Sequence, residues 1–548
     1  MTEPPKRTDS ITAPLRHPVF RRIWLASLLS NLGILIQGVG AAWAMTQMTS
    51  SADKVALVQT ALMLPIMLIS MPAGAIADMY DRRVVALVSL AIALAGATAL
   101  TVMAWLNLVT PNILLAFCFI VGCGMALFGP AWQASVSEQV PAETLPAAVA
   151  LNGISYNIAR SFGPAIGGLV VATAGAVAAF AVNAALYLPL MVVLFLWNRT
   201  HEPSRLPRER LNRAMVSGVR YIANSPSIRI VLIRTLVTGI IGGSVSALMP
   251  LVARDLLHGG AQTYGVMLGA FGMGAVFGAL NISEVRRRMS GEAAVRACAI
   301  SMAGAIVAVA LVLAGAVWML AVALFNIGVQ LSAPRWVAGR SLAAFQASIA
   351  GGIAVGSWGW GHLTDLAGVE TALLVSAGLM LISPLLGIWL RMPRVGARNE
   401  DATEVLADPE VRLSLTARSG PLVVEIEYRV AQDSARAFHN VMQEVQLSRQ
   451  RNGAYGWSIA RDIGDPELWT ERYHCPTWLD YLRQRNRPTQ SERALHQRAI
   501  DFHLGPDPIR VRRMLERPFG SVRWKEDTPD RAANEVLPVV ATAAGSST

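Results

Sequence analysis

The chain has 548 residues, of which 53% are hydrophobic and only 15% are charged, and its mean hydropathy is +0.43. Soluble proteins carry about 25% charged residues. The residues from 394 on hold 22 basic and 22 acidic groups, so the whole net charge of +11 lies in the first 393 residues. These numbers exclude a large soluble enzyme and indicate a polytopic membrane protein followed by a solvated tail.

Apolar runs of roughly 20 residues follow one another along the first 391 residues. Each run is expected to be a helix, because hydrocarbon offers no partner for a free backbone amide. Only a turn around Gly315 separates the ninth run from the tenth. The fold class expected from this pattern is all-α with twelve transmembrane helices. The predicted spans are 20–46, 55–77, 84–106, 113–133, 150–172, 175–197, 230–252, 264–283, 294–315, 317–338, 342–363 and 369–391.

Basic residues are concentrated in alternate loops between these spans. Of the 25 Lys and Arg residues before residue 394, 21 lie on one side when the spans are threaded through a bilayer. By the positive-inside rule that side is the cytoplasm, so both termini are expected there in a multi-pass inner- or plasma-membrane protein. The same cations are expected to face anionic lipid and not nucleic acid. The four cysteines form no framework, and no cleavable signal peptide, metal site or cofactor is expected.

The longest loop between spans is rich in arginine and divides them six and six. The fourth span ends in Pro130-Ala-Trp132 and the tenth in Pro334-Arg-Trp336, which occupy matching places in the two halves. Such halves indicate a parallel repeat about an axis along the membrane normal. The expected organisation is an N-terminal segment (1–19), a first half (20–197), a central loop (198–229), a second half (230–391), a linker (392–419), a C-terminal domain (420–527) and a disordered tail (528–548).

The loop after the second span combines small, acidic and basic residues, which are Gly74, Asp78, Arg82 and Arg83. It resembles the G-x-x-x-D-(R)-x-G-R-R/K signature of the major facilitator superfamily, with Asp81 where the family usually has Gly. The resemblance implies a cytoplasmic gate, in which the carboxylate pairs with basic groups on the next helix until the halves rock apart. The alternative is that Asp78 solvates a tight turn and the arginines are topology charges. A degenerate copy at 284–288 favours the gate.

The fifth span contains a short motif, Gly163-Pro164-Ala165-Ile166-Gly167-Gly168. It resembles the G-P-x-x-G-G motif of exporters in the same superfamily, although the glycines alone predict only close helix packing. Residues 15–393 are most similar to the enterobactin-exporter-like branch, also described as transmembrane secretion effectors. This resemblance implies secondary active efflux of a small organic solute such as a siderophore or drug, with a proton or ion gradient. Cys118 and Val121 occupy the positions where drug antiporters of this superfamily usually carry Arg and Gln. This departure weakens the inference that transport is coupled to proton antiport.

Two arginines lie within predicted spans, Arg160 in the fifth and Arg234 in the seventh. A cation at membrane depth costs about 2.5–3.5 kcal/mol on insertion scales, so it usually faces a cavity. Arg160 shares a helix stripe with the motif glycines and is expected to face the pathway and an anionic substrate, whereas Arg234 could snorkel to the interface. Further polar residues within the spans could either line the pathway or form hydrogen bonds between helices. They are Gln37, Asn157, Asn183, Tyr187, Asn326 and Gln330.

Beyond residue 420 the pattern is that of a small soluble domain. Strands are predicted at 421–430, 455–463, 468–475 and near 518–524, with helices from Asp433 and over 477–484 and 491–503. The order βαββαβ is that of a ferredoxin-like α+β unit. It is similar to the antibiotic-biosynthesis-monooxygenase-like barrels, which pair two such units. A dimerising or regulatory tail is favoured over a cofactor-free oxygenase that would make the exporter bifunctional. A transport-dead membrane sensor is the third alternative.

Overall fold

The computed structural model describes residues 12–141, 144–197, 211–393, 409, 411–413 and 415–516. They form two compact units, one made of most of the chain up to 395 and one made mainly of the chain from 396 on, together with residues 216–226 and 334–337. The expected N-terminal segment and linker lie partly outside the described residues. The expected disordered tail (528–548) lies wholly outside them.

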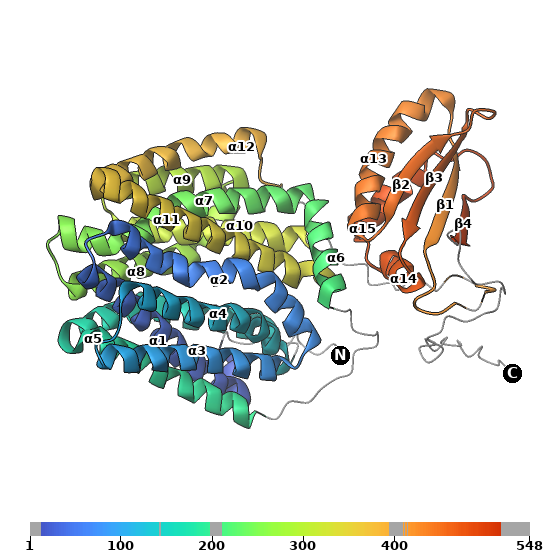
Figure 1. Cartoon of the computed structure of the whole chain (residues 1–548). Helices are drawn as coiled ribbons and strands as arrows, with labels where there is room; N and C mark the ends of the chain where they lie inside the picture. The colour runs from blue at the N-terminus through green and yellow to red at the C-terminus, as the bar shows by residue number, and fades with distance from the viewer. Residues whose placement is uncertain are drawn as a thin grey trace, which may run out of the picture. The chain divides into compact units, whose positions relative to one another are not determined.

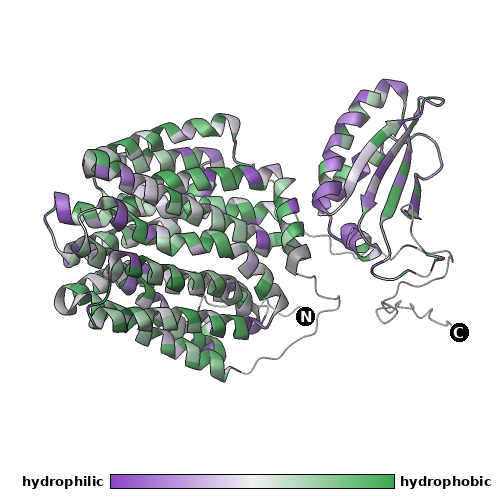
Figure 2. Ribbon diagram, viewed as in Figure 1, coloured by the Kyte–Doolittle hydropathy of each residue, from purple (hydrophilic) through white to green (hydrophobic). Residues whose placement is uncertain are grey.

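The first unit is a bundle of long apolar helices (Figures 1 and 2). Within the described residues, nine helices are long and apolar enough to cross a membrane, so this unit is that of a multi-pass membrane protein. Its helices are α1 (Pro18–Met48), α2 (Ala52–Met79), α3 (Arg82–Trp105), α4 (Pro111–Ser135), α5 (Leu145–Leu196), α7 (Pro226–Leu251), α8 (Ala261–Arg288), α9 (Gly291–Val307), α10 (Leu311–Ser332), α11 (Arg335–Ile382) and α12 (Leu386–Trp389). Helix α6 (Leu211–Ala223) belongs mostly to the second unit.

Two of these helices are broken by glycine at matching places in the sequence. Helices α5 and α11 run for 52 and 48 residues, which at about 1.5 Å per residue is more than twice the thickness of a bilayer core. The backbone leaves the helical conformation at Gly175 (φ 79°) and at Gly368 (φ 85°). Positive φ values are readily accessible only to glycine. Gly368 lies in the loop predicted between the last two spans, and Gly175 is the first residue of the predicted sixth span.

The turn between α9 and α10 lies earlier than the sequence predicts. Helix α9 ends at Val307 and α10 begins at Leu311, so the turn is at residues 308–310 and the predicted turn at Gly315 is wrong. Gly315 lies inside α10, where a side chain would collide with the backbone of Phe271 on α8. A glycine within an apolar run can mark a close helix contact as well as a turn, and hydropathy does not distinguish the two.

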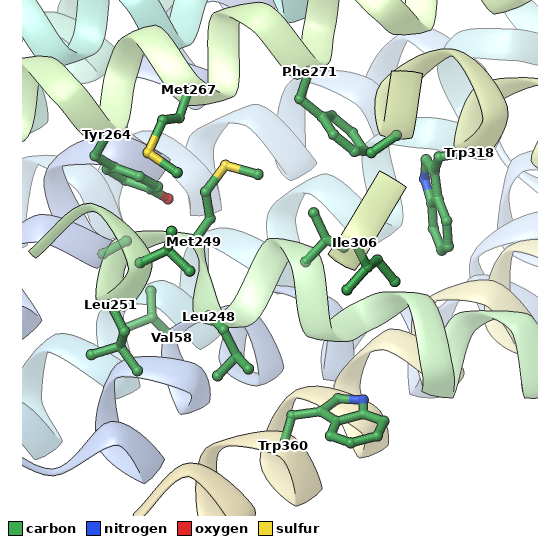
Figure 3. Packing of buried hydrophobic residues seen from close by; sticks show 14 of the residues in the cluster. Val58, Leu248, Met249, Leu251, Tyr264, Met267, Phe271, Ile306, Trp318 and Trp360 are labelled. Atoms are coloured by element: carbon green, nitrogen blue, oxygen red, sulfur yellow. The ribbon is translucent and has the colours of Figure 1, made fainter. Parts of the chain in front are cut away.

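Both halves of the bundle contribute to one buried hydrophobic cluster. In Figure 3, Tyr264, Met267 and Phe271 project from α8 into this cluster, with Met249 of α7 nearby. The ring of Trp43 on α1 stacks on Tyr264, with centroids 6.5 Å apart. The first half therefore packs directly against the second through aromatic and sulfur-containing side chains.

The second unit contains a four-stranded antiparallel sheet in the order β2-β3-β1-β4. The central strands place Ile426 opposite Glu471 and Val424 opposite Tyr473. Alternate residues of β1 face the helices and join the core of this unit, including Val424 and Ile426. The elements are β1 (Leu422–Arg429), α13 (Ala435–Arg451), β2 (Tyr455–Arg461), β3 (Leu468–Cys475), α14 (Trp478–Asn486), α15 (Gln490–Ile500) and β4 (Arg510–Leu515).

The last strand differs from its predicted position. Strand β4 is Arg510–Leu515, and the predicted segment 518–524 lies outside the described residues. Arginines at 510, 512 and 513 hide the alternating pattern, because they sit where apolar residues would reveal a strand. Arg512 lies opposite Glu425 and forms an ion pair with Glu427, at 2.9 Å. The arginines of β4 thus pair with glutamates of β1, and the distance between the two strands in the sequence gives no sign of this pairing.

Candidate transport pathway

The glycine motif lies where α5 packs against helices from both halves. A Cβ atom at Gly167 would lie 3.0 Å from the Cα atom of Ile36 on α1. A Cβ atom at Gly168 would lie 2.8 Å from the Cα atom of Gly265 on α8. Gly163 faces Leu35, and the carbonyl oxygen of Pro164 approaches Gly265. The motif therefore fixes α5 between its own half and the other one, in keeping with the packing role of such glycines.

Arg160 lies on the same helix, where α5 still contacts α8. A side chain at Gly272 would clash with the backbone carbonyl of Arg160, so the two helices are in close contact here. The guanidinium group lies over the Phe271 ring, 5.6 Å from its centroid, and Nη1 is 4.0 Å from the Sδ atom of Met319. Both partners come from the second half. The Arg160 charge therefore lies at the contact between the halves, against the polarisable ring of Phe271 and the sulfur of Met319. No ion pair found among the described residues includes Arg160.

Glu138, an acid just after α4, pairs with an arginine of the gate loop. Arg82 donates from Nη1 to Glu138 at 2.8 Å and to the carbonyl oxygen of Ala134 at 2.7 Å. Arg83 donates to the carbonyl oxygen of Phe195. These two motif arginines therefore tie the start of α3 to α4 and α5 within the first half.

The other residues of this loop have separate roles in the structure. Asp81 accepts a hydrogen bond from the backbone N–H of Arg83 at 2.8 Å and caps α3, which explains an acid where the family usually has glycine. Gly74 faces α11, with its Cβ position 3.7 Å from Ala343. Asp78 belongs to the last turn of α2, and its side chain lies outside the described part of the chain.

Arg234 is buried in an ion-pair network of the second half. Its side chain is 4% exposed, and Nη1 donates to Glu292 of α9 and, at 3.2 Å, to the carbonyl oxygen of Leu390. Glu292 also accepts from Arg296 at 2.8 Å and from the backbone N–H of Met392 at 2.9 Å. The network joins α7, α9 and the end of the bundle after α12. A cavity lined by Thr238, Cys298, Met302, Trp318, Phe325 and Met380 borders Arg234.

Four of the remaining polar residues are held within a single half. Asn183 donates to Gln37 in a buried contact between α5 and α1. Tyr187 is fully buried one turn beyond Asn183. The structure thus places these three at helix–helix contacts, the alternative role that the sequence leaves open. Asn157 donates to the carbonyl oxygen of Gly153 in its own helix at 2.9 Å.

Asn326 and Gln330 share one face of α10, as their spacing predicts. Gln330 donates from its side-chain amide to Asn326 at 2.6 Å, and Gln330 is exposed. This pair and Arg160 are therefore more open than the buried Gln37–Asn183 contact. They keep polar atoms available at the surface of the helices.

The C-terminal unit has a buried charged cluster around Glu471, whose side chain is completely buried. Glu471 accepts hydrogen bonds from Arg449 at 3.0 Å, from Trp457 at 3.0 Å and from the Tyr428 hydroxyl at 3.1 Å. Burial and the nearby Glu471 carboxylate raise the pKa of Tyr428. The sequence signal for this residue is that Glu471 alternates with Trp469, Tyr473 and Cys475 in the predicted strand, so an acid falls on an otherwise apolar face.

His496 of α15 lies near this cluster. Burial, followed by the charges of Arg449 and Arg451, lowers the pKa of His496 to about 2, so the imidazole is neutral. Within the described residues, no group of three or more His, Cys, Asp or Glu side chains could hold a metal ion. The cluster is therefore a set of buried, mutually satisfied charges and hydrogen bonds.

Comparison with known proteins agrees with this architecture. The chain is 26% identical over 406 residues to the multidrug efflux pump Tap of Mycobacterium tuberculosis, covering 68% of this chain and 94% of the pump. It is 26% identical over 323 residues to the enterobactin exporter EntS of Escherichia coli, covering 58% of this chain and 75% of the exporter. These relatives are transporters and not enzymes.

Solved structures show the same fold at low sequence identity. The nucleoside transporter NupG is 13% identical, with a TM-score of 0.51 over 68% of this chain and 98% of that one. A bacterial homologue of the human lysosomal transporter Spinster, in an inward-facing and unoccupied conformation, is 11% identical, with a TM-score of 0.53 over 69% and 96%. The family model described as transmembrane secretion effector matches residues 9–519, so the chain belongs to this family of major facilitator efflux transporters.

Proposed function

We propose that this protein exports a small organic molecule by alternating access between two six-helix halves. In this proposal α5 and α11 each supply two spans on either side of Gly175 and Gly368, and the 17-residue α9 supplies another, for twelve in all. Both termini lie in the cytoplasm, on the side that holds most basic residues. The efflux activity named for Tap and EntS supports export as the direction.

The observation that carries the proposal is the position of Arg160. Its guanidinium group lies between the halves, contacts Phe271 and Met319 across the seam, and belongs to no ion pair found among the described residues. A planar guanidinium can bind a carboxylate or another planar anion through two parallel hydrogen bonds. The substrate class that fits is therefore an organic anion with apolar or aromatic parts, which would contact Phe271 beside the charge.

Other parts of the proposed pathway and gate follow from the same arrangement. Asn157, Asn326 and Gln330 are retained as pathway residues because, as whole residues, they are less buried than Gln37 and Asn183. Asp78 is proposed to close the cytoplasmic side with basic groups of the loop, supported by its family motif alone. A proton or ion gradient is the proposed energy source, by analogy with other secondary transporters.

The C-terminal domain is proposed to have a ferredoxin-like fold and to dimerise or regulate the transporter. The strand order β2-β3-β1-β4, with antiparallel neighbours, is the order that a βαββαβ unit of this type adopts. Its likeness to monooxygenase-like barrels supports pairing of two domains. Light scattering of the purified full chain, compared with a chain that ends at residue 395, tests pairing. A monomeric full chain would contradict it.

The export proposal is tested by efflux from vesicles that contain equal amounts of each variant. The solutes are three fluorescent probes of similar size, one anionic, one neutral and one cationic. We expect Arg160→Ala to abolish most efflux of the anionic probe and Arg160→Lys to weaken it, because lysine keeps the charge but loses the fork. The matched control is Arg22→Ala, which removes an exposed cation at the start of α1. Normal efflux by Arg160→Ala would make the residue structural.

A further inference from the structure

An acidic residue of the second half caps a helix of the first. Asp365 on α11 accepts hydrogen bonds at Oδ1 from the backbone N–H of Ala52, at 2.6 Å, and at Oδ2 from that of Asp53, at 3.0 Å. Oδ2 also accepts from the Ser51 hydroxyl at 2.9 Å. Helix α2 begins at Ala52, so these are the first N–H groups of the helix, which have no partner within it. The cap comes from a residue more than 300 positions away.

A basic residue of the second half contacts the neighbouring helix end. Arg254, just after α7, donates from Nη1 to the carbonyl oxygens of Thr46, at 3.0 Å, and Thr49, at 3.5 Å, at the C-terminal end of α1. Its other nitrogens pair with Asp255, with Nε–Oδ1 at 2.5 Å and Nη2–Oδ2 at 3.0 Å. Asp255 therefore positions the guanidinium group so that Nη1 points to α1. Both residues lie in a π-helical turn, Val252–Leu256.

Both contacts hold the same short turn between α1 and α2, residues 49–51. The carboxylate meets the positive end of α2 and the guanidinium meets the negative end of α1, so each charge is complementary to the helix dipole that it faces. Close packing of α11 on α2 supports the arrangement, because a Cβ atom at Gly361 would lie 2.9 Å from the Cα atom of Asp53. The Thr60 hydroxyl also donates to the carbonyl oxygen of Ala354 on α11, at 2.9 Å.

We infer that Asp365 and Arg254 form a clasp that closes this end of the bundle and must release when the two halves separate here. The inference rests on the proposed alternating access, and it adds the residues that control one of the two openings. By the proposed topology, this end is the non-cytoplasmic one. The clasp sets the balance between the closed and open states because its bonds cross between halves and exist only in the closed state.

The test uses the full chain and the reactivity of a buried cysteine. Val58 of α2 is 2% exposed and belongs to the buried cluster that both halves share (Figure 3). A Val58→Cys substitution, in a background without the partly exposed Cys123, reacts with a charged, membrane-impermeant maleimide only when this end opens. The labelling rate is then proportional to the open fraction. Removing one cap should raise that rate about fivefold.

The variants are Asp365→Ala and Arg254→Ala, singly and together, with Asp365→Asn as a conservative change. We expect faster labelling in both alanine variants, the fastest in the double variant, and an intermediate rate for Asp365→Asn, which keeps one acceptor oxygen. Glu370→Ala removes an exposed carboxylate from the same helix and should leave the rate unchanged. Labelling after denaturation confirms that each variant holds the same amount of reactive cysteine.

An unchanged labelling rate in the double variant would overturn the clasp. The assay contains no solute, so it is independent of the export proposal. Faster labelling without transport of any probe would leave the clasp standing and count against the exporter. Transport of a probe together with an unchanged labelling rate in the double variant would support the exporter and overturn the clasp.

Discussion

Replacing Gly168 with alanine tests whether the glycine motif of α5 is a packing device. The new Cβ atom would lie 2.8 Å from both the carbonyl oxygen of Ala261 and the Cα atom of Gly265. Both are backbone atoms of α8, so neither can rotate away as a side chain could. The contacts have to lengthen to the ordinary 3.4 Å or more, which moves α5 away from α8. Such overpacking costs about 1–3 kcal/mol.

The matched control is Gly153→Ala on the same helix, where a Cβ atom would meet nothing within 4 Å. Both variants gain the helix propensity of alanine over glycine, about 1 kcal/mol, so the difference between them isolates the clash. We expect Gly153→Ala to be slightly stabilising and Gly168→Ala to unfold at a temperature lower than the control by roughly 1–4 °C. Thermal unfolding of the two purified full-length proteins, followed by tryptophan fluorescence, measures this difference.

Equal melting temperatures for the two variants would refute the reasoning. They would mean that α8 yields without cost, and that the motif owes its form to something other than close packing. A lower melting temperature for Gly153→Ala would point the same way. A loss of efflux in Gly168→Ala at unchanged stability would instead assign the glycine to movement between states.

Two further predictions concern buried charges. Glu292→Gln should destabilise the bundle by about 3 kcal/mol, because it leaves Arg234 buried without its carboxylate. Adding Arg234→Met should restore part of the loss. Equal melting temperatures for Glu292→Gln and the unchanged protein would contradict this prediction. His496 stays neutral when folded but binds a proton below about pH 6.5 when unfolded, so the C-terminal domain should lose about 2 kcal/mol between pH 7 and pH 5. Urea unfolding of the separate domain measures this, and the same slope in His496→Gln would rule it out.

The elements that the sequence predicts well are those fixed by a local pattern. Strand β3 has the predicted bounds, and its last five residues alternate between buried and more exposed positions. The breaks of α5 and α11 fall at predicted boundaries between spans, at glycines, which permit a conformation that other residues avoid. The turn before α10 was misplaced because Gly315 serves packing between helices, which depends on residues of α8 about 44 positions away.

Asp365 shows why the polar contacts between halves are hard to predict. In the sequence it is an acid near the end of a span, where solvation explains it fully. Its partners are backbone N–H groups, which every residue but proline possesses and which no motif can mark. The helix start at Ala52 is predictable, yet the sequence already supplies Ser51 as a local cap. Only the packing of α11 on α2 indicates that a second cap arrives from the other half.

The two arginines within the spans show that the sequence also cannot predict which buried charge has a partner. In sequence, Arg160 and Arg234 are both single cations in apolar helices, and neither has an acid one turn away. Glu292, which pairs with Arg234, lies 58 positions further on and begins the next-but-one helix. The fold neutralises one arginine within a single half and leaves the other at the contact between halves. A charge whose partner belongs to its own half can stay paired if the halves move, whereas under the proposed alternating access the contacts of Arg160 would change with every cycle.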